Sequence, residues 1–383
     1  AKVNAGNIQE ALNDIKLMND QTALNQISQY VYNNAITKAD AGNIQEALND
    51  VKLLNDQTAL HQISQHIYSN AIAKVNAGNI QEALNDIKLM NDQTALNQIS
   101  QYVYNNAITK ADAGNVQGAL NNVSLLGDQV KINQIGQHIY NNAISMANAG
   151  RFNDSINYIS KVNNQFLIND VTNIVKVLKI SNNYKYINKT SKYGLKFNTF
   201  YDNINDTYIN IQENYNYQNN KAHLDFDQML SIYVKLSNKS PKIFKNVNEF
   251  TITDIINPKD ILYGKLYGDG FTSAGEGANG IIRLFKYVDN PEYVIMHEAA
   301  HDADIKDNIQ FGISNSSEWE NAFKADGKGG VTKYANDSLN RKNDKYAEDF
   351  AESIALVQKN SKLFEANYPN RSAIIKRLFP ELY

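Results

Sequence analysis

The chain has 383 residues, of which 43% are hydrophobic and 20% are charged, with a net charge of −3 and no cysteine. This length is more than one ordinary hydrophobic core supports, so we expect two or three folded domains. The charge balance lacks the basic excess with which proteins bind phosphate backbones, and no apolar run reaches the roughly 18 residues of a bilayer span. We therefore expect no nucleic-acid partner and no membrane span. The lack of cysteine excludes disulfides, thiol catalysis and cysteine-ligated metal. No signal-like stretch follows Ala1, so we expect any targeting segment to have been removed or never present.

Residues 1–180 carry an internal repeat with a period of 36 residues. The segment Ala-Gly-Asn-Ile-Gln-Glu-Ala-Leu-Asn-Asp recurs, with degraded later copies, from Ala5, Ala41, Ala77, Ala113 and Ala149. Apolar residues at helical spacing mark two helices in each unit, for example Ile8, Ala11, Leu12 and Ile15, then Leu24, Ile27, Val31 and Ala35. Asn19 and Asp20 lie between the two helices and are expected to cap the second one. The repeat glycines are expected to end helices in the left-handed conformation: Gly6, Gly42, Gly78, Gly114 and Gly150. Since one helix pair cannot bury its own apolar face, we expect an all-α helical-repeat solenoid of four to five units.

The repeat length, the two-helix unit and the Gly-x-x-x-x-Ala-Leu pattern resemble tetratricopeptide repeats. This resemblance covers about residues 1–165 and implies a curved scaffold that binds a protein partner. The alternative is a spacer that only carries the domain that follows. Histidines occur in the array, but His61 and His66 stand where sister repeats have Asn25 and Tyr30. We interpret these as tolerant helix positions rather than metal ligands.

Composition changes after the array. Residues 181–220 are dominated by Asn, Tyr, Lys and Ile, which predicts an irregular connector. Residues 221–383 form the last predicted domain, with a helix from Phe226 to Tyr233 and strands at 250–253 and 281–285. The glycine-rich stretch between residues 263 and 280 is expected to be a turn-rich loop.

The motif that carries chemistry is His297-Glu298-Ala-Ala-His301. On a helix, residues four apart face the same side, so both imidazoles can hold one metal ion. Glu298 is turned about 100° from His297 and can reach a water on that ion. A hydrolytic zinc site needs a third protein ligand, and Asp304 is one candidate, although we favour for it a role in orienting a ligand or packing the helix.

The stronger third ligand lies further along the chain. Glu348 and Glu352 are one helical turn apart, so one carboxylate can bind the metal while the other accepts a proton from a ligand imidazole. The competing interpretation of these two residues is a solvated acidic face.

His-Glu-Ala-Ala-His-Asp-Ala-Asp, followed by Tyr-Ala-Glu-Asp-Phe-Ala-Glu-Ser, resembles the bacterial zinc metalloproteases of the anthrax lethal factor and Pro-Pro endopeptidase type. The likeness extends over about residues 221–383 and implies an α+β zincin-type domain with one Zn²⁺ per chain. It implies a secreted or cell-surface bacterial enzyme. In this resemblance the zinc ligands are His297, His301 and Glu348, the general base is Glu298, the tyrosine that stabilises the oxyanion is Tyr334, and the carboxylate behind the ligands is Glu352. Tyr346 is the alternative tyrosine.

We therefore expect a zinc-dependent endopeptidase that hydrolyses protein or peptide substrates. The strand near residues 281–285, or one beside it, is expected to pair with the extended substrate. Two alternatives stay open: a scaffold whose repeats bind a partner while the zinc domain is inactive, and a toxin component whose repeats contact a delivery partner. The sequence does not decide between Pro-Pro selectivity and a specificity like that of lethal factor.

Overall fold

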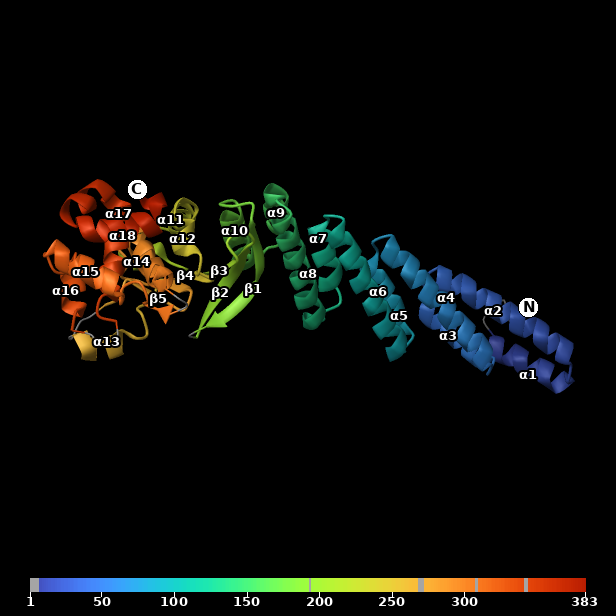
Figure 1. The fold of residues 1–383 in the computed structure, drawn as a ribbon. Helices are drawn as coiled ribbons and strands as arrows, with labels where there is room; N and C mark the ends of the chain where they lie inside the picture. Colours follow the sequence, from blue (N-terminus) through green and yellow to red (C-terminus); the bar gives the residue numbers. More distant parts are fainter. Residues whose placement is uncertain (1–6, 193, 268–271, 307–308, 341–343) are drawn as a thin grey trace. The chain divides into compact units, whose positions relative to one another are not determined.

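The computed structural model describes residues 7–192, 194–267, 272–306, 309–340 and 344–383 (Figure 1). The chain divides into two compact units, one made of Ala1–Ala143 with Ser155–Ile168 and the other of Ile144–Asp154 with Asn169–Tyr383. The first unit is helical and the second combines a mixed sheet with helices. A helical N-terminal region followed by an α+β domain, as predicted from the sequence, is therefore confirmed.

The helices of the repeats alternate between short and long. Their bounds are α1 Ile8–Met18, α2 Gln21–Asp40, α3 Ile44–Leu53, α4 Gln57–Asn76, α5 Ile80–Leu89, α6 Gln93–Asp112, α7 Val116–Ser124, α8 Gln129–Asn148, α9 Phe152–Ile159 and α10 Gln165–Leu178. From α1 to α6, each helix contacts the next one and the one after it, so successive pairs stack. Their apolar faces form shared cores, for example Ile44, Leu48 and Val51 with Ile63 and Ile67.

The predicted turns of the array are present. The Asp20 carboxylate accepts a hydrogen bond from the Ala23 amide at 2.9 Å and so caps α2. The repeat glycines have positive φ angles of 84° at Gly42, 90° at Gly78, 85° at Gly114 and 75° at Gly150. Gly6 lies outside the described residues.

Positions 66, 102 and 138 of the array are less tolerant than the sequence indicated, because each side chain has a matched partner in the preceding repeat. The pairs are His66 Nε2 with Asp40 at 2.6 Å, Tyr102 Oη with Asn76 at 3.0 Å and His138 Nε2 with Asp112 at 2.7 Å. Histidine therefore accompanies aspartate, and tyrosine accompanies asparagine. A substitution at one position alone would break a bond between repeats.

Residues 181–220 do not form the irregular connector that we predicted. They supply the strands β1 Tyr184–Lys192, β2 Leu195–Asp202 and β3 Thr207–Gln212, followed by the short 3₁₀-helix η2 Tyr217–Asn219. Buried aromatic and aliphatic residues alternate along these strands, as at Phe200, Ile209 and Ile211. The asparagines obscured this pattern, since residues such as Asn210 are buried within a polar row, where the Thr199 hydroxyl donates to Asn210 Oδ1 at 2.8 Å.

Within the described residues, six strands form one sheet in the order β1-β2-β3-β4-β6-β5. The strands β4 Glu249–Ile252 and β6 Ile281–Leu284 confirm the two predicted strands, and β5 Gly275–Ala278 is an edge strand. Pairing is antiparallel for β1 with β2, β2 with β3 and β5 with β6, and parallel for β3 with β4 and β4 with β6. The glycine-rich stretch was thus only partly a loop, because β5 and the end of α13 lie within it; its residues 268–271 lie outside the described part.

The remaining helices belong to the same compact unit as this sheet. They are α11 Phe226–Lys239, α12 Pro241–Phe244, α13 Asp260–Tyr267, α14 Pro291–Ala303, α15 Ser317–Asp326, α16 Lys333–Ser338, α17 Ala347–Asn367, α18 Pro369–Leu378 and the 3₁₀-helix η3 Pro380–Leu382, with a small hairpin of β7 Ile305–Lys306 and β8 Ile309–Gln310. Helix α14 packs against β5 and β6 and lies beside α17 (Figure 1). Among the helices described, none is both long and apolar enough to cross a bilayer.

Candidate metal centre

Helix α14 positions the two histidines. It begins after Asn290, whose side chain accepts a hydrogen bond from the Tyr293 amide at 3.2 Å, and Pro291 occupies its first turn. His297 and His301 follow on one face, both more than 90% buried, with their Nε2 atoms 3.2 Å apart. The helix therefore aims two imidazole nitrogens at one point, as the motif predicted.

Glu348 completes this arrangement from the first turn of α17. Its Oε2 atom lies 3.2 Å from His297 Nε2 and 3.4 Å from His301 Nε2. The three atoms form a nearly equilateral triangle, which has the spacing of three ligands around one ion. Burial disfavours a charge on Glu348, but hydrogen bonding to both imidazoles outweighs burial and holds the pKa of this carboxyl well below its usual range.

His297, Glu298 and His301 also form a buried group able to hold a metal ion, since their ligand atoms all lie within 4.8 Å of one another. Two carboxylates, Glu298 and Glu348, therefore adjoin the imidazoles. Of the two, Glu348 has an oxygen 3.2–3.4 Å from the Nε2 atoms of both imidazoles.

Glu352 lies behind His297, one turn along α17 from Glu348. Its Oε1 atom is 2.8 Å from His297 Nδ1, and its Oε2 atom accepts a hydrogen bond from the Tyr293 hydroxyl at 2.7 Å. Burial opposes the charge on Glu352, yet the hydrogen bond to His297 prevails and the pKa of this carboxyl is lowered. When Nε2 binds a metal ion, a carboxylate at Nδ1 would hold the ring proton on Nδ1 and leave the Nε2 lone pair free for the ion.

Sequence reasoning missed Tyr293. The available signal was its position one turn before His297 on the same helix, which places its hydroxyl on the side of the helix that His297 occupies. The Tyr293 hydroxyl donates to Glu352, which in turn contacts His297, so Tyr293 supports the imidazole through Glu352.

Glu298 faces the edge strand of the sheet. A Cβ atom added at Gly275 would lie 2.9 Å from Glu298 Oε1, and one at Gly277 would lie 2.8 Å from Oε2 and 2.6 Å from the Glu298 carbonyl oxygen. Glycine is therefore required for this close approach. Burial raises the pKa of the Glu298 carboxyl. Together with His297 and Tyr334, Glu298 lines a pocket of about 270 Å³, which has room for several water molecules or part of a peptide.

Tyr334 rather than Tyr346 lies at the centre. Its hydroxyl donates to Glu348 Oε1 at 3.2 Å, and its ring centroid is 6.1 Å from that of His297. Tyr346 is buried and its hydroxyl lies 3.4 Å from Glu320 Oε1 instead. Helix α16 thus brings Tyr334 back to Glu348 across the fourteen residues that separate them.

Asp304 ends α14 and anchors a loop. Its Oδ1 atom accepts hydrogen bonds from the amides of Ile313 and Ser314, both at 2.9 Å. These contacts hold the segment after β8 against the end of the helix. These hydrogen bonds explain why Asp304 is buried, and no role as a metal ligand is needed to explain it.

Comparison of the chain with protein-family models, with curated proteins and with solved structures finds no match. The resemblance to bacterial zinc metalloproteases therefore rests on the motif residues themselves.

Proposed function

We propose that this chain is a zinc-dependent endopeptidase that cleaves protein or peptide substrates, with a zincin-type α+β domain as its catalytic part. The observation that carries the proposal is the triangle of His297 Nε2, His301 Nε2 and Glu348 Oε2, with edges of 3.2, 3.2 and 3.4 Å. Each Nε2 atom carries at most one proton, so hydrogen bonds from the two imidazoles would account for two of the three short distances. A single ion bound by all three atoms accounts for all three distances.

The spacing fits tetrahedral zinc. Tetrahedral zinc with bonds of about 2.0–2.1 Å to nitrogen and oxygen places its ligand atoms about 3.3–3.4 Å apart. Two imidazoles and one carboxylate are a known ligand set of catalytic zinc and leave the fourth position open. The three residues would hold one Zn²⁺ per chain, which would polarise a peptide carbonyl and lower the pKa of a water towards 7.

Glu298 is the general base of the proposed reaction. Buried beside the imidazoles and facing the pocket, it can take a proton from the attacking water and later deliver it to the leaving amine. A raised carboxyl pKa suits both steps, since the group must gain and release a proton in one cycle. Glu352 and Tyr293 hold the His297 ring in one tautomer throughout.

Tyr334 supplies a hydrogen-bond donor to the negative charge that develops on the carbonyl oxygen. Its side chain is 40% exposed and lies over the pocket, so its hydroxyl can turn from Glu348 to a bound substrate. One donor of this kind contributes about 10²–10³ in kcat.

The edge strand β5 is the place where an extended substrate would bind. Its outer edge is unpaired among the described strands and runs beside Glu298, so main-chain hydrogen bonds would set a peptide across the pocket. Gly275 and Gly277 allow β5 to lie this close to Glu298. Strand β5 lies beside β6, so it is one of the two choices that the sequence left open.

We propose that the repeats are a tetratricopeptide-like module that binds a protein partner, in a secreted or cell-surface bacterial protein. A spacer role and a toxin component with a delivery partner are the alternatives. A chain that binds one zinc but cleaves no member of a peptide library would favour the scaffold role over the enzyme. The same library decides between Pro-Pro selectivity and other specificities.

The deciding experiment is Glu298→Gln in the full chain. We expect one zinc per chain in both wild type and variant, with cleavage abolished only in the variant, because the ligands are intact while the base is lost. Glu292→Gln on the same helix is the matched control, since Glu292 lies on the surface 3.9 Å from Lys235. Normal cleavage by Glu298→Gln would rule out the mechanism.

A further inference from the structure

Arg371 on α18 is a fully buried cation outside the site described above. Its side chain has no exposed surface and lies between the rings of Phe323 and Tyr368, 4.9 and 4.5 Å from their centroids. Its Nε donates to Asp326 at 2.9 Å, and its Nη1 reaches both oxygens of Asp349 at 2.7 and 2.9 Å. A charge this deep is stable only with such partners.

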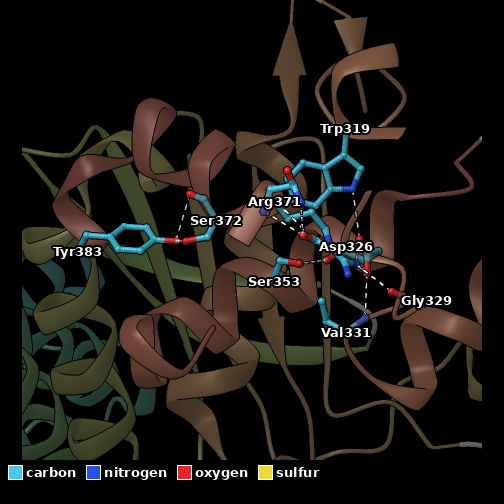
Figure 2. Close-up of polar contacts among 10 residues, drawn as sticks. Trp319, Asp326, Gly329, Val331, Ser353, Arg371, Ser372 and Tyr383 are labelled. Atoms are coloured by element: carbon cyan, nitrogen blue, oxygen red, sulfur yellow. Dashed lines mark hydrogen bonds and ion pairs between the residues drawn. The ribbon is translucent and has the colours of Figure 1, made fainter. Parts of the chain in front are cut away.

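Asp349 is the residue that joins this cluster to the metal centre. Besides Arg371, it accepts hydrogen bonds from the Trp319 indole at 3.3 Å and from the Val331 amide at 3.0 Å. Arg371 also donates to the Gly329 carbonyl at 3.1 Å. Figure 2 shows Trp319, Arg371 and the segment of Gly329 and Val331 lying close together.

Two consequences follow from the position of Asp349 in the first turn of α17. It is the neighbour of Glu348 and turned about 100° from it, so fixing one carboxylate to Arg371 fixes the rotation that aims the other at the imidazoles. The segment bound by Asp349 and Arg371, residues 329–331, leads directly into α16, which carries Tyr334.

We infer that Arg371 is a positioning residue of the metal centre: through Asp349 it sets both Glu348 and the segment that carries Tyr334. The last helix is then part of the catalytic apparatus, although none of its residues lines the pocket beside Glu298. This inference rests on the proposed function, and it assigns no contact between Arg371 and substrate or metal.

The test compares Arg371→Lys and Asp349→Asn with Arg377→Leu in the full chain. Lysine keeps the charge but cannot hold two carboxylates in a fork, and asparagine keeps the shape of Asp349 but loses its charge. Arg377 is the matched control, because it lies on the same helix and pairs with Glu318 at the surface. Thermal unfolding establishes that each variant is folded at the assay temperature.

The first measurement needs neither metal nor activity. In metal-free protein with ¹³C-labelled histidine, we expect the ring resonances of His297 and His301 to shift in both Arg371→Lys and Asp349→Asn. Those of His61, His66, His138 and His223 are expected to stay in place. The second is competition with a zinc chelator, where we expect affinity about 10–100-fold weaker, with kcat reduced and KM within threefold of wild type.

Folded Arg371→Lys and Asp349→Asn proteins with wild-type histidine spectra and wild-type zinc affinity would overturn the inference. So would an equal effect of Arg377→Leu. A wild-type chain that neither binds zinc nor cleaves peptide would instead refute the proposed function, and the metal-free spectra would still decide whether Arg371 positions the site.

Discussion

Gly277→Ala tests the close approach of the edge strand β5 to Glu298, the proposed general base. The new Cβ would lie 2.6 Å from the Glu298 carbonyl oxygen, whereas ordinary contact begins at 3.4 Å, so β5 and α14 must separate by about 0.8 Å. Overpacking of this size costs about 1–3 kcal/mol of stability. A displacement of about 1 Å at a catalytic group can cost 100-fold in rate, so we expect kcat/KM to fall about 10–100-fold.

The metal site should respond less than cleavage does, because the three atoms nearest the new Cβ all belong to Glu298. The assay therefore pairs cleavage of a peptide substrate with zinc affinity and thermal unfolding. Gly136→Ala is the matched control: nothing lies within 4 Å of its added Cβ, and alanine in the interior of α8 should stabilise by about 0.5–1 kcal/mol without altering cleavage. A Gly277→Ala protein with wild-type turnover and wild-type stability would refute the close approach of β5 to Glu298.

Three further predictions follow from single contacts. Tyr334→Phe should lower kcat about 10²–10³-fold with zinc still bound, measured by initial rates beside metal analysis; an unchanged kcat would remove the tyrosine from the mechanism. Glu352→Gln should weaken zinc binding about 10–100-fold, because a neutral amide polarises His297 less, and chelator competition measures the loss; equal affinity would contradict it. In the array, His66→Tyr and Asp40→Asn should each destabilise the protein, while the double variant recovers stability with a coupling of about 0.2–1 kcal/mol in a denaturation cycle; additive effects would deny the pairing. Hydrogen bonding to His66 lowers the pKa of Asp40, so this contribution is present above pH 3.8 and lost as the pH falls through the lower folded-state value, as unfolding measured against pH should reveal.

Periodic features were predictable from the sequence because they depend on local spacing. The 36-residue repeat predicted helix pairs and left-handed glycines, and the same logic of residues four apart predicted one face for His297 and His301. Glu348 was also within reach, since its spacing from Glu352 marks one face of a helix. The structure brings all of these together as expected.

Features that depend on pairing between distant segments were not predictable. Strands β1 to β3 were missed because buried asparagines such as Asn210 read as loop residues until their sheet partners are known. The match of His66 with Asp40 spans 26 residues, so single positions looked interchangeable. Arg371 is an ordinary surface residue by sequence, and only the tertiary fold shows it between two carboxylates.

The most direct test of the account is a crystal structure of the zinc-loaded chain with anomalous scattering measured at the zinc edge. We predict one ion bound at about 2.0–2.2 Å by Nε2 of His297, Nε2 of His301 and a carboxylate oxygen of Glu348. An ion held elsewhere, or a Glu348 side chain turned away from it, would contradict the central claim.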